Sequence, residues 1–357
     1  MDKKDIVKSF ILKTQKNIDG LRSVLDKKEN IILFIGSGFS TSAGYMSWNN
    51  LLDYLIDKLP ECTVGKERIE DLKNLLNQNY DTSDKQNGAS DFPKLALQIK
   101  EEYDKLDIID HYYGYICKVY DEKDEINDEK IGVNAFHLNT LKLKHKAIIT
   151  TNYDFHIEKI LNPLSHLILD YQNENAFTLH SFIRNFSKTK PESEILHIHG
   201  AIENYNSIIL SEDEYNEAYG FIIEPRQETK DSLDKSWTIL SRLLWALFTF
   251  NHIIFIGFGL HDPFIDKMLS ISCKDSWLWL NDNHYALMPF NSDIENLSER
   301  QKKIDDLNNK LGIKTILYDS KDGHEELNTL INDLIIEVKE THIPKRTIDP
   351  MDGSNAE

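Results

Sequence analysis

Cysteine is scarce in this sequence. The 357 residues include three cysteines, Cys62, Cys117 and Cys273, which lie far apart. This count argues against a disulfide framework and against a four-cysteine zinc site, and it suits a reducing compartment. The sequence also lacks any apolar run of the roughly 18 residues that a transmembrane helix needs, and its first residues lead into an amphipathic helix rather than a signal-peptide core. We therefore expect a cytoplasmic protein with no membrane partner.

Positive charge is in deficit as well. The chain has 41 Lys and Arg residues against 59 Asp and Glu residues, so its formal net charge is −18. Such a surface repels the phosphates of nucleic acid at long range, and we expect no direct nucleic-acid partner. Apolar residues make up 40% of the chain, enough to bury a substantial core in one large or two moderate domains.

The first glycine-rich segment, Gly36–Gly38, follows the apolar run Ile31–Ile35. Five consecutive apolar residues are typical of a strand buried on both faces. Small residues and then a helical pattern over Trp48–Leu59 come next. A strand, a glycine turn and a helix in this order can bring backbone N–H groups to a phosphate. An ordinary turn between a strand and a helix has the same pattern, because there is no P-loop lysine and Thr41 stands where a third glycine would be.

Apolar runs alternate with helical patterns along the rest of the chain. This predicts an α/β fold with a Rossmann-like, mostly parallel sheet and helices on both faces. We expect an N-terminal helix over residues 1–30, one α/β domain over residues 31–340 with a helical insertion at about 60–134, and a disordered polar tail over residues 341–357. The strands after the first are expected near residues 147–150, 167–170, 195–200, 253–256, 285–288 and 313–318.

Four predicted strands end in glycine or polar residues. These ends are Gly36–Gly38, Thr151–Asp154, His199–Gly200 and Gly257–Pro263. In open α/β sheets, ligands bind outside the carboxyl ends of the strands. The four segments together therefore predict one pocket at one edge of the sheet, although each pattern alone is weak.

These segments resemble the motifs of the sirtuin superfamily. Gly36–Gly44 looks like its opening NAD-binding motif, Thr151–Asp154 resembles its Asn-x-Asp motif, and His197–Gly200 resembles its catalytic His-Gly. Gly257–Pro263 is similar to the later glycine loop near the adenosine end of NAD. The order and spacing fit over about residues 31–290. The best match is to bacterial sirtuin-like domains that consume NAD in anti-phage defence.

Two departures separate this sequence from the sirtuin deacylases. Those enzymes carry a four-cysteine zinc module after the His-Gly motif, whereas Ala201–Phe250 contains no cysteine. We therefore expect no zinc. Deacylases also place an Asp that helps to hold the nicotinamide amide where this sequence has Ser47, so that contact must be made differently here.

The resemblance implies an NAD⁺ hydrolase that cleaves the nicotinamide–ribose bond and yields nicotinamide and ADP-ribose. Positive charge develops on the sugar in such a reaction, as in glycoside cleavage. Asn152 would hold the ribose hydroxyls and a water, His199 would act as general base, and Asp154 would orient them. The implied NAD-binding residues are Gly36, Ser37, Gly38, Phe39, Ser40, Thr41, Ala43, Trp48, Thr151, Gly257, Phe258, Gly259 and Asp262.

Purely structural roles are open for several of these residues. Asn152 could close a strand with a side-chain turn, Asp154 could be only a helix N-cap, and Trp48 could pack in the core. We expect Asp262 to cap the helix that starts at the next residue. His197 is expected to be a hydrogen-bonded core histidine rather than a metal ligand, and no metal site is expected.

Two other functions remain open. The chain could be an NAD-dependent protein deacylase or ADP-ribosyltransferase, or a sensor that binds NAD or ADP-ribose without turnover. An enzyme that depletes NAD must be regulated, because constant activity would kill its host. The resemblance suggests a homo-oligomer that is activated by a protein partner such as a hexameric ATPase or a nucleic-acid-guided Argonaute-like protein.

Overall fold

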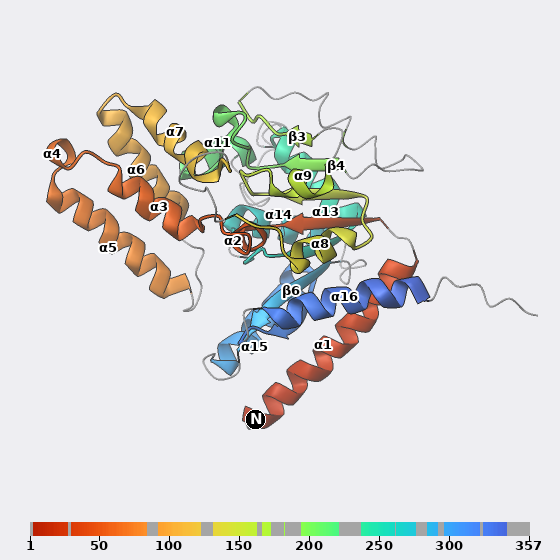
Figure 1. Cartoon of the computed structure of the whole chain (residues 1–357). Helices are drawn as coiled ribbons and strands as arrows, with labels where there is room; N and C mark the ends of the chain where they lie inside the picture. The colour runs from red at the N-terminus through yellow and green to blue at the C-terminus, as the bar shows by residue number, and fades with distance from the viewer. Residues whose placement is uncertain are drawn as a thin grey trace, which may run out of the picture.

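The computed structural model describes residues 3–27, 30–83, 92–122, 131–162, 166–172, 182, 194–220, 237–260, 262–275, 284–291, 296–321 and 324–340. Within these residues, one seven-stranded sheet has the order β3-β4-β2-β1-β5-β6-β7 with all neighbouring strands parallel (Figure 1). The predicted Rossmann-like α/β fold is thereby confirmed. The strands are β1 Ile31–Ile35, β2 Ala147–Thr150, β3 His166–Ile168, β4 Glu194–His197, β5 His252–Ile256, β6 His284–Phe290 and β7 Ile313–Asp319.

Helices precede and follow the strands. They are α1 Lys3–Asp26, α2 Ser37–Thr41, α3 Trp48–Asp57, α4 Glu61–Val64, α5 Lys66–Ser83, α6 Phe92–Lys105, α7 Ile109–Tyr120, α8 Ala135–Lys142, α9 His156–Leu161, α11 Glu212–Tyr219, α13 Ile239–Phe250, α14 Pro263–Asp275, α15 Leu297–Leu311 and α16 Glu325–Glu340, with a 3₁₀ turn η1 at Tyr205–Ser207. In the described part of the chain, no helix has both the length and the apolar character to cross a bilayer.

The central strand β1 is buried on both faces, as its five apolar residues predict. Ile32 and Phe34 pack into a core with residues of α13 and α14, whereas Leu33 and Ile35 pack into a second core with residues of α1 and α16. The alternation follows from the two-residue period of a strand. Burying each such side chain contributes about 1.5–3 kcal/mol, so β1 anchors both layers of helices.

The helices α4–α7 lie between residues 60 and 134, where the sequence predicts a helical insertion. Together with α3 they enclose a separate core and gather beside the sheet, at the left of Figure 1. The Tyr103 hydroxyl of α6 donates to the Leu55 carbonyl of α3 at 2.7 Å and joins the two helices. The division of the chain into domains stays a prediction. The predicted disordered tail, residues 341–357, lies outside the described residues.

The chain changes direction in the sheet at β1. From β1 it passes to β2, β3 and β4 on one side, and it then crosses to β5 on the other side. Such a switch point is where ligands bind in open α/β sheets. The carboxyl ends of β1, β2, β4 and β5 therefore define the region where a site is expected.

Candidate active site

The glycine turns after β1 and β5 pack directly against each other. The Gly36 N–H donates to the Ile256 carbonyl at 3.0 Å, and the Gly38 N–H donates to the Gly257 carbonyl at 2.8 Å. A Cβ on Gly36 would lie 2.7 Å from the Gly257 oxygen, and Gly257 itself has a φ of +63°. These glycines therefore allow the backbones of the two turns to approach each other closely. Two of the N–H groups predicted to bind a phosphate already donate to protein carbonyls.

Asn152 lies two residues beyond the end of β2. All of its polar atoms except one form hydrogen bonds within the protein. Its backbone N–H donates to the Thr150 hydroxyl at 3.0 Å, and its side-chain Nδ2 donates to the Gly36 carbonyl at 3.1 Å and to Ser40 Oγ at 2.8 Å. Both amide hydrogens are thus used within the protein. The Oδ1 atom is buried, and none of the described residues forms a hydrogen bond with it. An amide fixed in this way presents a preorganised acceptor.

His197, the last residue of β4, forms a hydrogen bond with the Asn152 backbone. Its Nδ1 lies 2.8 Å from the Asn152 carbonyl oxygen and its Nε2 lies 2.8 Å from Glu158 Oε1 of α9. A carbonyl and a carboxylate both accept hydrogen bonds, so this geometry favours the doubly protonated ring. Burial alone would lower the pKa of His197, but the hydrogen bond and charge of Glu158 outweigh it and raise the pKa. The expected core histidine is therefore a charged support for Asn152.

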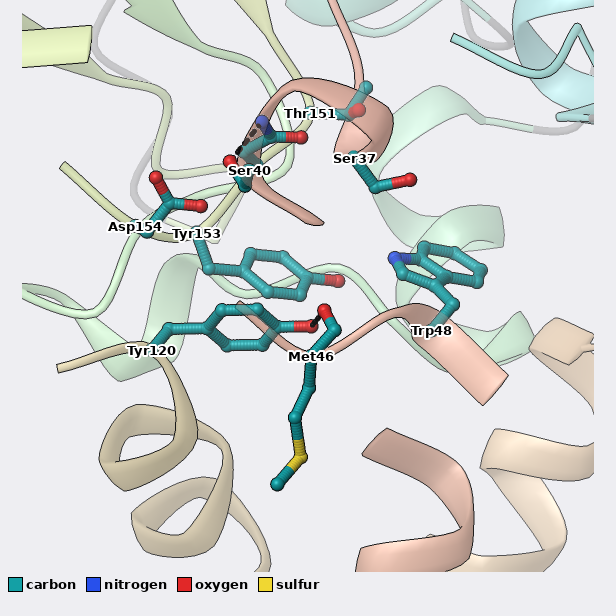
Figure 2. A pocket seen from close by; sticks show the side chains of 9 residues that line it. Ser37, Ser40, Met46, Trp48, Tyr120, Thr151, Tyr153 and Asp154 are labelled. Carbon is teal, nitrogen blue, oxygen red and sulfur yellow. Dashed lines mark hydrogen bonds between the residues drawn. The ribbon is translucent and has the colours of Figure 1, made fainter. Parts of the chain in front are cut away.

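A small pocket opens beside Asn152. In Figure 2 the rings of Tyr120, Tyr153 and Trp48 face the hydroxyl groups of Ser37 and Thr151 across it. Its lining residues are Ser37, Ser40, Met46, Trp48, Tyr120, Thr151, Asn152, Tyr153 and Asp154. The cavity therefore combines an aromatic wall with the polar ends of β1 and β2.

Asp154 contacts the start of α9, where the sequence left a helix-capping role open. Its Oδ1 accepts a hydrogen bond from the His156 N–H at 3.0 Å, at the start of α9. Burial raises the pKa of the Asp154 carboxyl, while hydrogen bonds from the Ser40 hydroxyl and the His156 backbone oppose this rise. Ser40 thus accepts a hydrogen bond from Asn152, and its hydroxyl also opposes the rise in the pKa of Asp154.

His199 lies two residues beyond the end of β4, the strand next to β2. The register pairs Thr150 with His197, so Asn152 and His199 are equally far beyond their strands at one edge of the sheet. The His199 Nε2 lies 2.7 Å from the Tyr219 hydroxyl, and its Nδ1 is buried without a partner. Burial lowers the pKa of His199 to about 3. The ring is therefore neutral, and it is not among the residues that line the cavity.

Gly200 is required by its surroundings. It has a φ of +79°, and a Cβ there would lie 2.2 Å from the Ser207 carbonyl oxygen. No side chain fits that space without moving the backbone that follows η1. This contact explains in physical terms why glycine follows His199.

The other predicted NAD-binding residues fall into two groups, those that line the cavity and those that do not. Ser37, Ser40, Trp48 and Thr151 line the cavity, and their binding role stays a prediction. Asp262 instead caps α14, as its position before Pro263 predicts, because its Oδ1 accepts from the Phe264 and Ile265 N–H groups at 2.9 and 3.0 Å. Outside the cavity lining lie Gly36, Gly38, Phe39, Thr41, Ala43, Gly257, Phe258, Gly259 and Asp262.

Several residues around the site were not singled out in the sequence. Met46, Tyr120 and Tyr153 line the cavity, and Tyr219 contacts His199. Tyr153 lies within the Thr151–Asp154 segment and could have been found there. Tyr120 ends α7, far from every motif, and no local pattern marks it. Ser47, where deacylases have Asp, caps α3 by accepting a hydrogen bond from the Asn50 N–H at 3.3 Å.

Comparison with known proteins bears on this geometry. A family model described as a SIR2-like domain matches residues 146–316, from β2 into β7. The match covers a little less than half of the chain, and over that segment the chain is similar to a SIR2-like domain. Within the described residues, the SIR2-like protein has no group of three His, Cys, Asp or Glu side chains placed to hold a metal ion.

Curated relatives of the SIR2-like protein carry NAD-related and defence-related names. "NAD(+) hydrolase ThsA" of Enterococcus faecium is 25% identical over 293 residues, 81% of this chain and 46% of the relative. "NAD(+) hydrolase ThsA" of Bacillus cereus strain MSX-D12 is 24% identical over 264 residues, 73% of this chain and 43% of the relative. "Defense-associated sirtuin 2" of Bacillus subtilis is 20% identical over 270 residues, 73% of this chain and 21% of the relative. The chain thus spans less than half the length of these relatives.

Proposed function

We propose that this SIR2-like protein is an NAD⁺ glycohydrolase that cleaves the nicotinamide–ribose bond. The observation that carries the proposal is the Asn152 amide, whose Nδ2 hydrogens are both used inside the protein and whose buried Oδ1 has no partner beside the cavity. A preorganised acceptor at this position suits a ribose hydroxyl or an attacking water. The names of the distant relatives support the same class of reaction.

The cavity suits the nicotinamide end of the substrate. Its aromatic wall and the hydroxyl groups that face it would receive the nicotinamide and its ribose. Trp48, Tyr120 and Tyr153 would contact the nicotinamide ring. In sirtuin deacylases an Asp helps to hold the nicotinamide amide. Ser47 stands at that position here and caps α3, so the aromatic contacts would replace the contact of that Asp.

In the reaction, water adds to the anomeric carbon of the ribose as the bond from that carbon to the nicotinamide nitrogen breaks. Nicotinamide leaves as a neutral molecule, and the proton that the water gives up is released to solvent. Asn152 Oδ1 would orient the water or a ribose hydroxyl, and the neutral ring of His199 would accept a hydrogen bond from one of them. Asp154 and Ser40 would keep Asn152 in place.

Depletion of NAD⁺ in a phage-infected cell is the role that we propose for this activity, leading to abortive infection. The relative named as a defence-associated sirtuin supports the setting. An NAD⁺ hydrolase that is always active would harm its own cell. We therefore propose cytoplasmic homo-oligomers whose activity depends on an activating protein partner.

The direct test is nicotinamide release from NAD⁺ by the purified protein, with and without candidate activators, followed by chromatography. We expect release without any peptide, and we expect Asn152→Ala and His199→Ala to lower kcat/KM by about 100-fold or more. The exposed His111 of α7 provides the control His111→Ala, which should retain activity. Release only with an acylated peptide would favour a deacylase, and tight NAD⁺ binding without release under every condition would favour a sensor.

A further inference from the structure

The ring of His199 is contacted by helix α11, which carries no recognised motif. The Tyr219 hydroxyl at the end of α11 lies 2.7 Å from His199 Nε2. Tyr215, one turn earlier on the same helix, packs its ring at 5.2 Å from the His199 ring in an edge-on arrangement. The His199 Nδ1 has no partner. Among the hydrogen bonds of the described residues, the one to Tyr219 therefore fixes which way the ring faces.

Asp262 adds a negative group on the same side of the ring. Its Oδ2 lies 3.9 Å from His199 Nε2 and accepts a hydrogen bond from the Tyr215 hydroxyl at 2.9 Å. A carboxylate near Nε2 favours the tautomer that carries its proton on Nε2. In that tautomer Nε2 donates to the Tyr219 oxygen, and Nδ1 keeps a free lone pair. This is the form of His199 that can accept a proton or a hydrogen bond.

The start of α11 is anchored to the helical insertion. Glu214 is 2% exposed at its side chain, and its Oε2 accepts from the Leu210 and Ser211 N–H groups at 2.8 Å each. Its Oε1 accepts from Lys100 Nζ of α6 at 2.9 Å and from the Tyr113 hydroxyl of α7 at 2.7 Å. One buried carboxylate thus joins α6, α7 and α11.

Lys100 forms a largely buried ion pair with Glu214. Its side chain is 16% exposed, and Nζ also lies 2.8 Å from Asp213 Oδ2. A buried ion pair with satisfied hydrogen bonds specifies one arrangement, because removal of either partner leaves an unpaired charge. Figure 1 shows α11 beside α6 and α7, between the insertion and the sheet.

We propose that α11 links the helical insertion to His199, with Tyr219 as the positioning residue and the Lys100–Glu214 ion pair as the anchor. A protein partner that moved α6 or α7 would thereby change the placement of the His199 ring. The importance of this link for catalysis rests on the proposed NAD⁺ hydrolysis. The link itself can be tested without it.

The first experiment measures the His199 ring in the full-length protein without ligand. Histidine labelled with ¹⁵N gives ring signals, and the signal that is lost in His199→Gln identifies His199 among the 13 histidines. We expect Tyr219→Phe and Lys100→Met to shift the His199 nitrogen signals. The buried Tyr112 hydroxyl has no partner, and Lys105 is 60% exposed in a pair with Glu102, so Tyr112→Phe and Lys105→Met are the matched controls that should leave them in place.

The second experiment measures NAD⁺ cleavage by the same variants. Tyr219→Phe should lower kcat by roughly tenfold, the size of one lost hydrogen bond to a reacting group, with KM within about twofold because the cavity lining is intact. Lys100→Met should lower kcat less, and Lys100→Arg should restore part of it. If the His199 signals of Tyr219→Phe match those of Tyr112→Phe, the link is refuted. If the signals shift but the wild-type protein cleaves no NAD⁺ under any condition, the proposed function fails and the link stands.

Discussion

The buried pair of His197 and Glu158 makes a prediction about stability that needs no assay of activity. The His197 side chain is 0% exposed and that of Glu158 is 10% exposed, and the two are joined by a 2.8 Å contact. We consider Glu158→Gln, which keeps the shape and an acceptor oxygen but removes the charge. A hydrogen bond to a charged partner contributes about 1.5–3 kcal/mol. We expect the free energy of unfolding to fall by that amount near pH 6.

The dependence on pH follows from the raised pKa of His197 in the folded protein. A histidine whose pKa is raised by folding adds stability that is fully present below its unfolded pKa of about 6.5 and is lost as pH rises through the folded value. The difference in stability between the wild-type protein and Glu158→Gln should therefore shrink as pH rises from 6 to 9. Buried histidines such as His199 and His284, whose pKa is lowered to about 3, affect both proteins equally and cancel in the difference.

The measurement is urea unfolding followed by tryptophan fluorescence at several pH values. The matched control is Glu203→Gln, because Glu203 is 59% exposed and pairs with the partly exposed His166 at 3.2 Å. A surface pair of this kind contributes less than about 1 kcal/mol, so the control should change little at any pH. A Glu158→Gln effect that is as small as the control's, or that stays constant from pH 6 to 9, would refute the charged state assigned to His197.

Two further predictions concern glycines. Gly200→Ala should lower the free energy of unfolding by more than about 2 kcal/mol, because a strained φ is combined with a backbone clash, whereas Gly65→Ala, which has a similar φ of +87° but nothing within 4 Å, should cost only about 1 kcal/mol. Equal shifts in melting temperature would contradict the clash. Gly114 lies inside α7 in open space, so Gly114→Ala should raise the free energy of unfolding by about 0.5–1 kcal/mol, and a lower melting temperature would contradict this.

Much of the fold could be predicted because its signals are local. Ile31–Ile35 and Ile253–Ile256 are continuous apolar runs, and such runs form strands wherever both faces of a sheet are covered by helices. The predicted capping role of Asp262 is also confirmed, since a cap depends on residues within one turn of its helix. Caps of this kind can therefore be predicted from the sequence.

The surroundings of the site depended on long-range packing. The sequence predicted that the strand ends with Asn152 and His199 share one edge of the sheet, but Tyr120 and Tyr219 come from α7 and α11, segments that no spacing relates to the motifs. The glycine turn was predicted to offer N–H groups to a phosphate, whereas those of Gly36 and Gly38 donate to the end of β5 and to the turn after it. The packing of the two glycine turns against each other therefore decides which backbone N–H groups remain available to a ligand.

The sequence by itself thus predicted a mostly parallel sheet and the residue types gathered at one edge of it. The tertiary structure alone decided that His197 is paired with Glu158 while His199 lies neutral against Tyr219. The two histidines are two residues apart, one at the end of β4 and one just beyond it, and burial acts on both. Their pKa shifts are opposite because burial alone lowers the pKa of His199, whereas the hydrogen bond and charge of the Glu158 carboxylate from α9 outweigh burial at His197, a contact that exists only once the helices have packed.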